Sequence, residues 1–213
     1  MINNKKLNGF TLIELIFVII ILGVMAAVAI GSVKNNIRED AINNVLAAVR
    51  YTQHLALADN KMDPNISNWQ KSLWTLEYAK CNGKYQYTIG SDMNLNGKIN
   101  ETESAMSVID DKLIYNNISN CKSNQSSDNI SIGKNFYITD IKFKDCGANN
   151  ISFDYLGRPH SNVNKILTSN YSSLNKKDCI ITYSFDTSLS FQPIVLTINS
   201  ETGYASINNR EGL

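Results

Sequence analysis

The sequence predicts an α+β protein in which a long N-terminal helix packs on an antiparallel β-sheet domain. Three observations carry this prediction: an apolar run over residues 10–30, an apolar stripe that continues at helical spacing towards Asp59, and short β-prone segments between Asn-, Ser- and Gly-rich loops after Tyr85. Pro64 ends the helical pattern, because the residue before a proline disfavours the helical conformation. The 213 residues suit one soluble domain with an appendage, or one larger domain.

The first element is the apolar run, which follows a short polar stretch that contains Lys5 and Lys6. Its length of about 21 residues gives a helix of roughly 30 Å, which matches the core of a bilayer. We therefore expect residues 10–31 to form a transmembrane segment. The two lysines hold the preceding end in the cytoplasm.

Two interpretations compete for this segment. In one it is a secretory signal peptide, cleaved after Ala27-Val28-Ala29. In the other the helix is retained, and Glu14, a costly charge in hydrocarbon, has a function there. The retained helix is favoured because a second, amphipathic half continues over residues 32–62, with its apolar stripe at Val33, Ile37, Ala41, Val45, Val49, Thr52 and Ala56.

Residues 63–213 are expected to form a β-rich domain. A weak helical period capped by Ser67 or Asn68 competes with a strand around Trp74. The expected strands are Tyr85–Ile89, Phe136–Phe143, Ile151–Tyr155, Cys179–Phe185, Ile194–Asn199 and Tyr204–Ile207. The polar stretch from Asn116 to Gly133 is expected to be an exposed insertion.

Four cysteines, Cys81, Cys121, Cys146 and Cys179, lie beyond the apolar run. An even count in a chain that leaves the cytosol predicts two disulfides. Four cysteines allow three connectivities. We favour Cys81–Cys121, which flanks the loop described next, together with Cys146–Cys179.

One loop matches the twelve-residue calcium-binding pattern at every ligand position. Its ligand positions are Asp92, Asn94, Asn96, Lys98 through its carbonyl, Asn100 through water, and Glu103, with a glycine at Gly97 for the sharp turn. With two charged ligands we expect weak, structural calcium binding. The competing interpretation is an Asx-rich turn in an asparagine-rich chain.

Catalysis finds little support in the sequence, and we expect no enzyme. A net charge of +1 argues against a nucleic-acid surface built on bulk positive potential, and the chain has no serine elbow, phosphate loop or zinc signature. His54 is expected on the helix surface, and His160 follows a turn.

The stretch from Gly9 to Leu15, Gly-Phe-Thr-Leu-Ile-Glu-Leu, resembles the cleavage and methylation motif of type IV pilins and type II secretion pseudopilins. The resemblance implies that residues 1–9 are a leader cut after Gly9 and that Phe10 becomes an N-methylated N-terminus. Glu14 would then neutralise the new α-amino group, on its own chain or a neighbour, and so set the register of assembly. Gly31 stands where many members of the family carry proline.

Two later segments resemble the H-type minor pseudopilin branch of that family. Ile151–Pro159 is similar to its Phe-Asp-x-Leu-Gly-Arg-Pro turn, and Ile198–Tyr204 to its terminal Thr-Gly hairpin. Within the first turn we expect Arg158 to be a structural residue rather than a substrate contact.

The family resemblance implies a minor subunit of a periplasmic filament in type II secretion or a related type IV pilus machine. Its partners would be other pilin or pseudopilin subunits, a prepilin peptidase and the bacterial inner membrane, crossed once with the β domain in the periplasm. The alternatives are a DNA-uptake pilin, for which the basic cluster of Lys165, Lys176 and Lys177 is weak support and which alone would bind nucleic acid, and a soluble periplasmic binding protein with a cleaved signal peptide.

Overall fold

The computed structural model describes residues 11–117, 121, 125–168 and 171–208, apart from the side chains of residues 27–36 and 171. The chain divides into two compact units, Met1–Glu39 and Asp40–Leu213. Among the described residues, no helix is both long enough and apolar enough to cross a membrane. The transmembrane segment predicted at residues 10–31 is therefore not shown by the structure.

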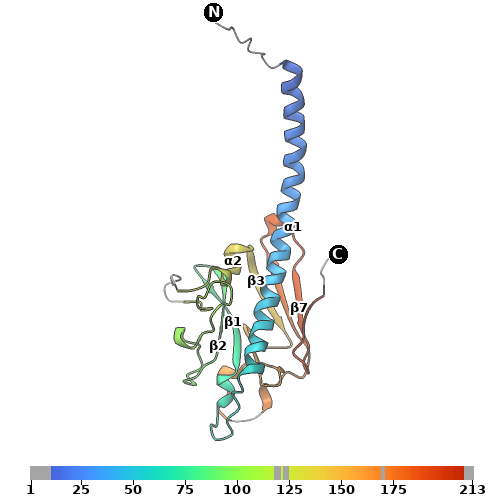
Figure 1. Cartoon of the computed structure of the whole chain (residues 1–213). Coiled ribbons are helices and arrows are strands. Elements are labelled where there is room, and N and C mark those ends of the chain that lie inside the picture. The colour runs from blue at the N-terminus through green and yellow to red at the C-terminus, as the bar shows by residue number, and fades with distance from the viewer. Residues whose placement is uncertain (1–10, 118–120, 122–124, 169–170, 209–213) are drawn as a thin grey trace, which may run out of the picture. The chain divides into compact units, whose positions relative to one another are not determined.

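A 47-residue helix, α1 (Leu12–Ala58), opens the described chain (Figure 1). Its part in the second unit buries one face completely, with Ala41, Ile42, Val45 and Val49 at 0% exposure. These residues recur at the spacing of three and four that places them on one side of a helix. The predicted amphipathic half is thus seen as far as Ala58, and Pro64 follows the helix end.

Two four-stranded antiparallel sheets complete the second unit, and with α1 they confirm the predicted α+β class. The first has the order β2-β1-β4-β5 and the second β3-β6-β7-β8. Their strands are β1 (Trp74–Cys81), β2 (Lys84–Gly90), β3 (Ile138–Lys144), β4 (Asn150–Phe153), β5 (Pro159–His160), β6 (Cys179–Phe185), β7 (Ile194–Ile198) and β8 (Ala205–Ile207).

The six strands expected from the sequence all form, within one or two residues of their predicted bounds. The segment left open between helix and strand forms both a short 3-10 turn, Trp69–Ser72, and β1. The tight connection from β1 to β2 consists of Asn82 and Gly83, both with positive φ, as a two-residue hairpin turn requires. The short strand β5 was not predicted, because two residues carry no periodicity.

The expectation of an exposed insertion at residues 116–133 is wrong in part. Asn116 is 4% exposed, Ile130 2% and Ile132 0%, and the last two belong to the main core. The short helix α2 (Ile132–Asn135) begins there. These two isoleucines hold an otherwise polar segment against the main core, because burying each side chain stabilises the folded state by about 1.5–3 kcal/mol.

The main core lies between the second half of α1 and both sheets. An aromatic group joins the sheets: the hydroxyls of Tyr78 on β1 and Tyr183 on β6 are 2.7 Å apart, and Phe143 on β3 packs on the same ring. Burial raises the pKa of Tyr87, which completes this group, to about 12. The hydroxyls in this layer therefore remain protonated at ordinary pH.

Candidate functional site

The predicted processing residues, Gly9 and Phe10, lie outside the described residues. The acidic residue of that motif, Glu14, lies in the first turn of α1 and closes a capping box with Thr11. Its Oε2 accepts hydrogen bonds from the backbone N–H and from the hydroxyl of Thr11, each at 2.8 Å. The N–H of Glu14 in turn donates to Thr11 Oγ1 at 3.4 Å. Glu14 therefore satisfies donors that a helix start would otherwise leave unpaired.

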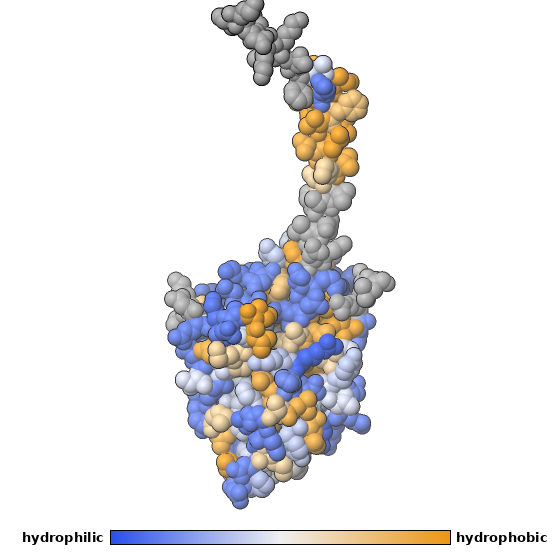
Figure 2. All heavy atoms as spheres, viewed as in Figure 1, coloured by the Kyte–Doolittle hydropathy of each residue, from blue (hydrophilic) through white to orange (hydrophobic). Residues whose placement is uncertain are grey.

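Beyond Glu14, the described N-terminal half of α1 is apolar on every side. Its large side chains from Leu12 to Met25 are exposed by 43–77%. Figure 2 shows this stretch as continuously hydrophobic below a hydrophilic start. An exposed surface of this extent marks a site for protein or membrane contact.

The loop from Asp92 to Glu103 is closed by its own side-chain oxygens. Asp92, only 4% exposed, accepts the N–H of Asn96 at 3.1 Å and that of Gly97 at 2.6 Å. Glu103 accepts the N–H of Asn94 at 3.0 Å and that of Asn100 at 2.9 Å. The first and last residues of the predicted ligand set are thus folded onto the same short stretch of backbone.

The amide residues of the loop follow the same arrangement. Asn94 Oδ1 accepts from the N–H of Asn96, and Asn96 Oδ1 accepts from the N–H of Lys98. Gly97 has φ +88°, the left-handed conformation that the sharp turn needs. Within the described residues no three His, Cys, Asp or Glu side chains gather as a metal cluster. At its predicted ligand positions the loop offers two carboxylates, those of Asp92 and Glu103, and the remaining donors there are amide and carbonyl oxygens. Such a set fits a hard cation such as calcium.

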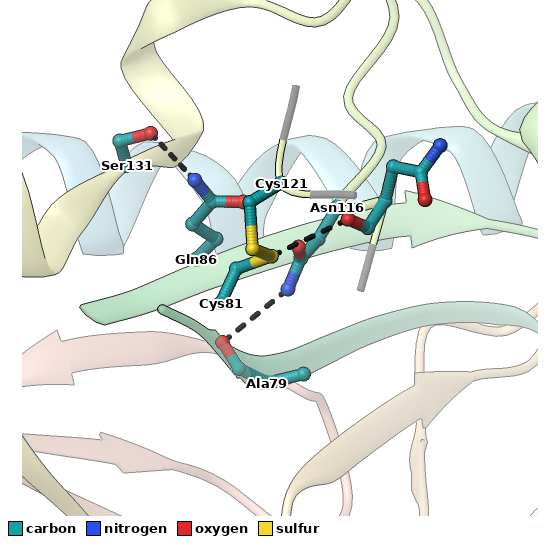
Figure 3. The surroundings of a disulfide bond; sticks show 7 residues. Ala79, Cys81, Gln86, Asn116, Cys121 and Ser131 are labelled. Atoms are coloured by element: carbon teal, nitrogen blue, oxygen red, sulfur yellow. Dashed lines mark hydrogen bonds between the residues drawn. A yellow bond between two sulfur atoms is a disulfide. The ribbon is translucent and has the colours of Figure 1, made fainter. Parts of the chain in front are cut away.

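Both disulfides of the favoured pairing are present. Cys81–Cys121 and Cys146–Cys179 have Cα separations of 5.5 and 5.2 Å. Around the first, Asn116 Nδ2 donates to the carbonyl of Ala79, and Gln86 Nε2 donates to Ser131 Oγ (Figure 3). The bridge thus ties the end of β1 to the segment that precedes α2.

The two turns that resemble the H-type branch meet on α1, at Gln53. Its Nε2 donates to the carbonyl of Gly157 at 3.0 Å and to the carbonyl of Thr202 at 2.9 Å. Gly157 and Gly203, one in each turn, both have positive φ, and a Cβ on Gly203 would collide with the carbonyl oxygen of Gly157. We call Gln53, Gly157, Thr202 and Gly203 the turn junction. Nothing in the sequence singled out Gln53, because a lone glutamine on an amphipathic helix has no distinguishing pattern.

Asp154 holds the first of these turns together. Its carboxylate accepts the N–H of Leu156 and of Arg158, and it forms an ion pair with the Arg158 guanidinium at 2.7 Å. His160 Nε2 lies 3.3 Å from the same carboxylate, and its Nδ1 lies 2.8 Å from Ser173 Oγ. Burial raises the pKa of Asp154, but the hydrogen bonds from His160 and Arg158 outweigh it and hold that pKa at about 2.

This network fits the structural role expected for Arg158. The side chains of Asp154 and His160 are 3% and 1% exposed, so an incoming substrate has no access to them. Their arrangement stabilises the turn. His54, by contrast, is exposed on α1, where the sequence placed it.

Comparison with known proteins bears on the N-terminal segment. Residues 4–30 match the family model described as "Prokaryotic N-terminal methylation motif". This motif supports a processed, type IV pilin-like subunit, and with it cleavage by a prepilin peptidase and assembly with other pilin subunits. No curated protein and no solved structure matches the chain. The match does not reach residues 151–159 or 198–204, so the likeness to the H-type branch stays a prediction.

Proposed function

We propose that this chain is a minor pseudopilin-like subunit that assembles by α1 into a periplasmic filament serving type II secretion or a related type IV pilus machine. The observation that carries the proposal is the methylation motif at residues 4–30, placed at the start of a 47-residue helix. Before assembly, the subunit would be anchored in the inner membrane by the apolar half of that helix, with the β domain in the periplasm. Its large domain with irregular loops favours a minor subunit over the major one.

In this proposal Glu14 has a second role beyond its cap. Cleavage after Gly9 would create an α-amino cation at Phe10, four residues before Glu14. A carboxylate and an ammonium in a low-dielectric environment attract far more strongly than in water, and a copy in the wrong register would leave one of them unpaired. The pair would therefore select register more than it adds stability.

Glu14→Gln tests this role, because glutamine also completes a capping box but carries no charge. The variant is expected to be inserted and trimmed normally and to enter filaments at least tenfold less than the wild type. Thr11→Ala, which removes the cap and keeps the charge, is the matched control and should assemble nearly normally. Normal incorporation of Glu14→Gln, measured by chemical cross-linking in intact cells followed by immunoblot, would refute the pairing argument.

We also propose that the loop from Asp92 to Glu103 binds calcium and that the ion stabilises the loop. With a dissociation constant of about 10⁻⁴–10⁻³ M, 10 mM calcium would add about 1–3 kcal/mol to the free energy of unfolding. Glu103→Gln should remove the calcium-dependent rise in melting temperature. Glu101→Gln, two residues away and outside the ligand positions, should keep it. A wild-type protein that melts at the same temperature in calcium and in chelator would end this proposal.

A further inference from the structure

A lysine from outside the loop between Asp92 and Glu103 contacts the backbone of that loop. The ammonium of Lys71 donates to the carbonyl of Leu95 at 3.2 Å. Leu95 lies between Asn94 and Asn96, two of the predicted ligand positions. Successive Cα atoms are only about 3.8 Å apart, so this ammonium is held close to the backbone that carries the ligands.

The turn that carries Lys71 is itself fixed beside the loop. Lys71 belongs to the 3-10 turn Trp69–Ser72, whose first residue is 5% exposed and packs in a small core of its own. The carbonyl of Ser72 accepts a hydrogen bond from Ser91 Oγ at 2.5 Å, directly before the first residue of the loop. Because the turn is anchored in this way, the Lys71 side chain remains near the loop.

Lys71 also shares a small pocket with the first ligand position. The pocket has a volume of about 20 Å³, and the charged residues that line it are Lys71, Glu77, Asp92 and Lys98. Of the two lysines, Lys98 is exposed, so water and salt screen its charge, whereas Lys71 is half-buried. The hydrogen bond to Leu95 and the pocket shared with Asp92 are separate observations, and both bring the Lys71 side chain to the ligand positions.

No carboxylate neutralises this ammonium at close range. Among the residues that the structure describes, Lys71 forms no ion pair, and its ammonium donates only to the carbonyl of Leu95. A carbonyl has no net charge, so the positive charge of Lys71 remains. We propose that Lys71 lowers the affinity of the loop for calcium, because its ammonium repels the ion from the ligand positions. The inference rests on the calcium binding proposed above and adds to it a residue that regulates the affinity.

The charges of the loop make it sensitive to one added cation. Only Asp92 and Glu103 are negatively charged among its ligand positions, so a single ammonium offsets half of that charge. A unit charge this close to a divalent ion, in surroundings between protein and water, changes a dissociation constant about three- to tenfold. Loss of the Lys71 charge should therefore lower the dissociation constant by that factor.

A competing interpretation of the same contact is that Lys71 only shapes the loop. Leu95 has φ +60°, a left-handed conformation that is unfavourable for leucine, and a hydrogen bond to its carbonyl helps to hold it there. Loss of Lys71 would then loosen the neighbouring ligand positions and weaken calcium binding. The two interpretations predict opposite changes in affinity, so one experiment separates them.

The experiment uses the full chain, purified in detergent with both disulfides formed. Thermal unfolding is followed at calcium chloride concentrations between about 10 μM and 20 mM, and the rise of the melting temperature gives the apparent dissociation constant. Lys71→Gln, which removes the charge, is expected to bind calcium about three- to tenfold more tightly than the wild type. Lys71→Met also lacks the charge and gives a second measurement if Lys71→Gln misfolds.

Two controls and a salt series isolate the charge. Lys71→Arg keeps the charge and a donor, and Lys142→Gln removes an exposed charge from β3 in the second sheet, so both should bind calcium as the wild type does. Salt screens the repulsion. At about 500 mM potassium chloride the affinities of Lys71→Gln and the wild type should therefore lie closer together than at about 20 mM. A contact that only shapes the loop would give no such convergence.

The outcomes distinguish this inference from the calcium proposal. A wild type that calcium stabilises, with equal or weaker binding in Lys71→Gln and Lys71→Met, would overturn the role of Lys71 and leave the calcium proposal standing. Tighter binding in Lys71→Arg as well would also overturn it, because that variant keeps the charge. A wild type whose melting temperature does not rise with calcium would overturn both.

Discussion

The two halves of α1 both carry large apolar side chains, but those of the first half are exposed and those of the second half are buried. In the first half Ile19 is 59% exposed, and in the second Ile42 is 0% exposed. The first half is apolar on every side, whereas the second carries its apolar residues on one stripe that faces two sheets. Apolar content shows that a helix has surface to bury, and the periodicity of the apolar residues shows how that surface is buried. A helix with one apolar stripe can bury it against a sheet, whereas a helix that is apolar on every side needs apolar surroundings all round.

The strongest test of this difference is the same substitution, isoleucine to alanine, in each half of α1. Ile42→Ala should lower the free energy of unfolding of the β domain by about 2–5 kcal/mol, because it leaves a cavity in the core. Ile19→Ala should change it by less than about 0.5 kcal/mol. Urea unfolding followed by tryptophan fluorescence measures both, since Trp69 and Trp74 lie in the β domain.

Similar losses in the two variants would contradict the division of the helix. They would mean that Ile19 also packs on the β domain. A lower free energy of unfolding in Ile42→Ala alone, together with poor filament incorporation of Ile19→Ala, would support this division. The second half of α1 would then stabilise the fold, and the first half would serve assembly.

A smaller effect is expected where the second half of α1 meets the turn junction. Gly203→Ala forces a Cβ against the carbonyl of Gly157, whereas Gly83→Ala has nothing within 4 Å of its Cβ. Both glycines have positive φ, at +67° and +74°, so both variants bear the same backbone strain. Gly203→Ala should therefore cost about 1–3 kcal/mol more than Gly83→Ala in thermal unfolding. Equal melting temperatures would show that the junction tolerates the extra methyl group.

Much of the fold could be predicted from the sequence, because the patterns that specify helices and strands lie within short stretches of the chain. Alternation predicted β6 over Cys179–Phe185 without error, and helical spacing predicted the buried stripe of α1. The Thr11-x-x-Glu14 spacing is also a capping-box signature, whereas the sequence analysis interprets Glu14 only as an assembly residue. The burial of Ile130 and Ile132 was missed because two apolar residues in a polar stretch define no period.

The candidate sites differ in the same way, according to whether their residues are contiguous in the sequence. The processing motif and the loop from Asp92 to Glu103 are contiguous, so their residue types could be recognised in order. The turn junction joins residues more than a hundred positions apart, such as Gln53 and Gly157, and depends on packing that no local pattern encodes. The pairing of Cys81 with Cys121 lies between these cases, since it was inferred from the loop that the two cysteines enclose.

The most direct measurement for the central claim is the mass of the N-terminal peptide of the mature protein, purified from membranes and digested for mass spectrometry. A processed pilin-like subunit predicts a chain that begins at Phe10 and carries one added methyl group on its α-amine, 14 Da above the unmodified peptide. A chain that begins at Ile30, after removal of the whole apolar half as a signal peptide, would contradict the account.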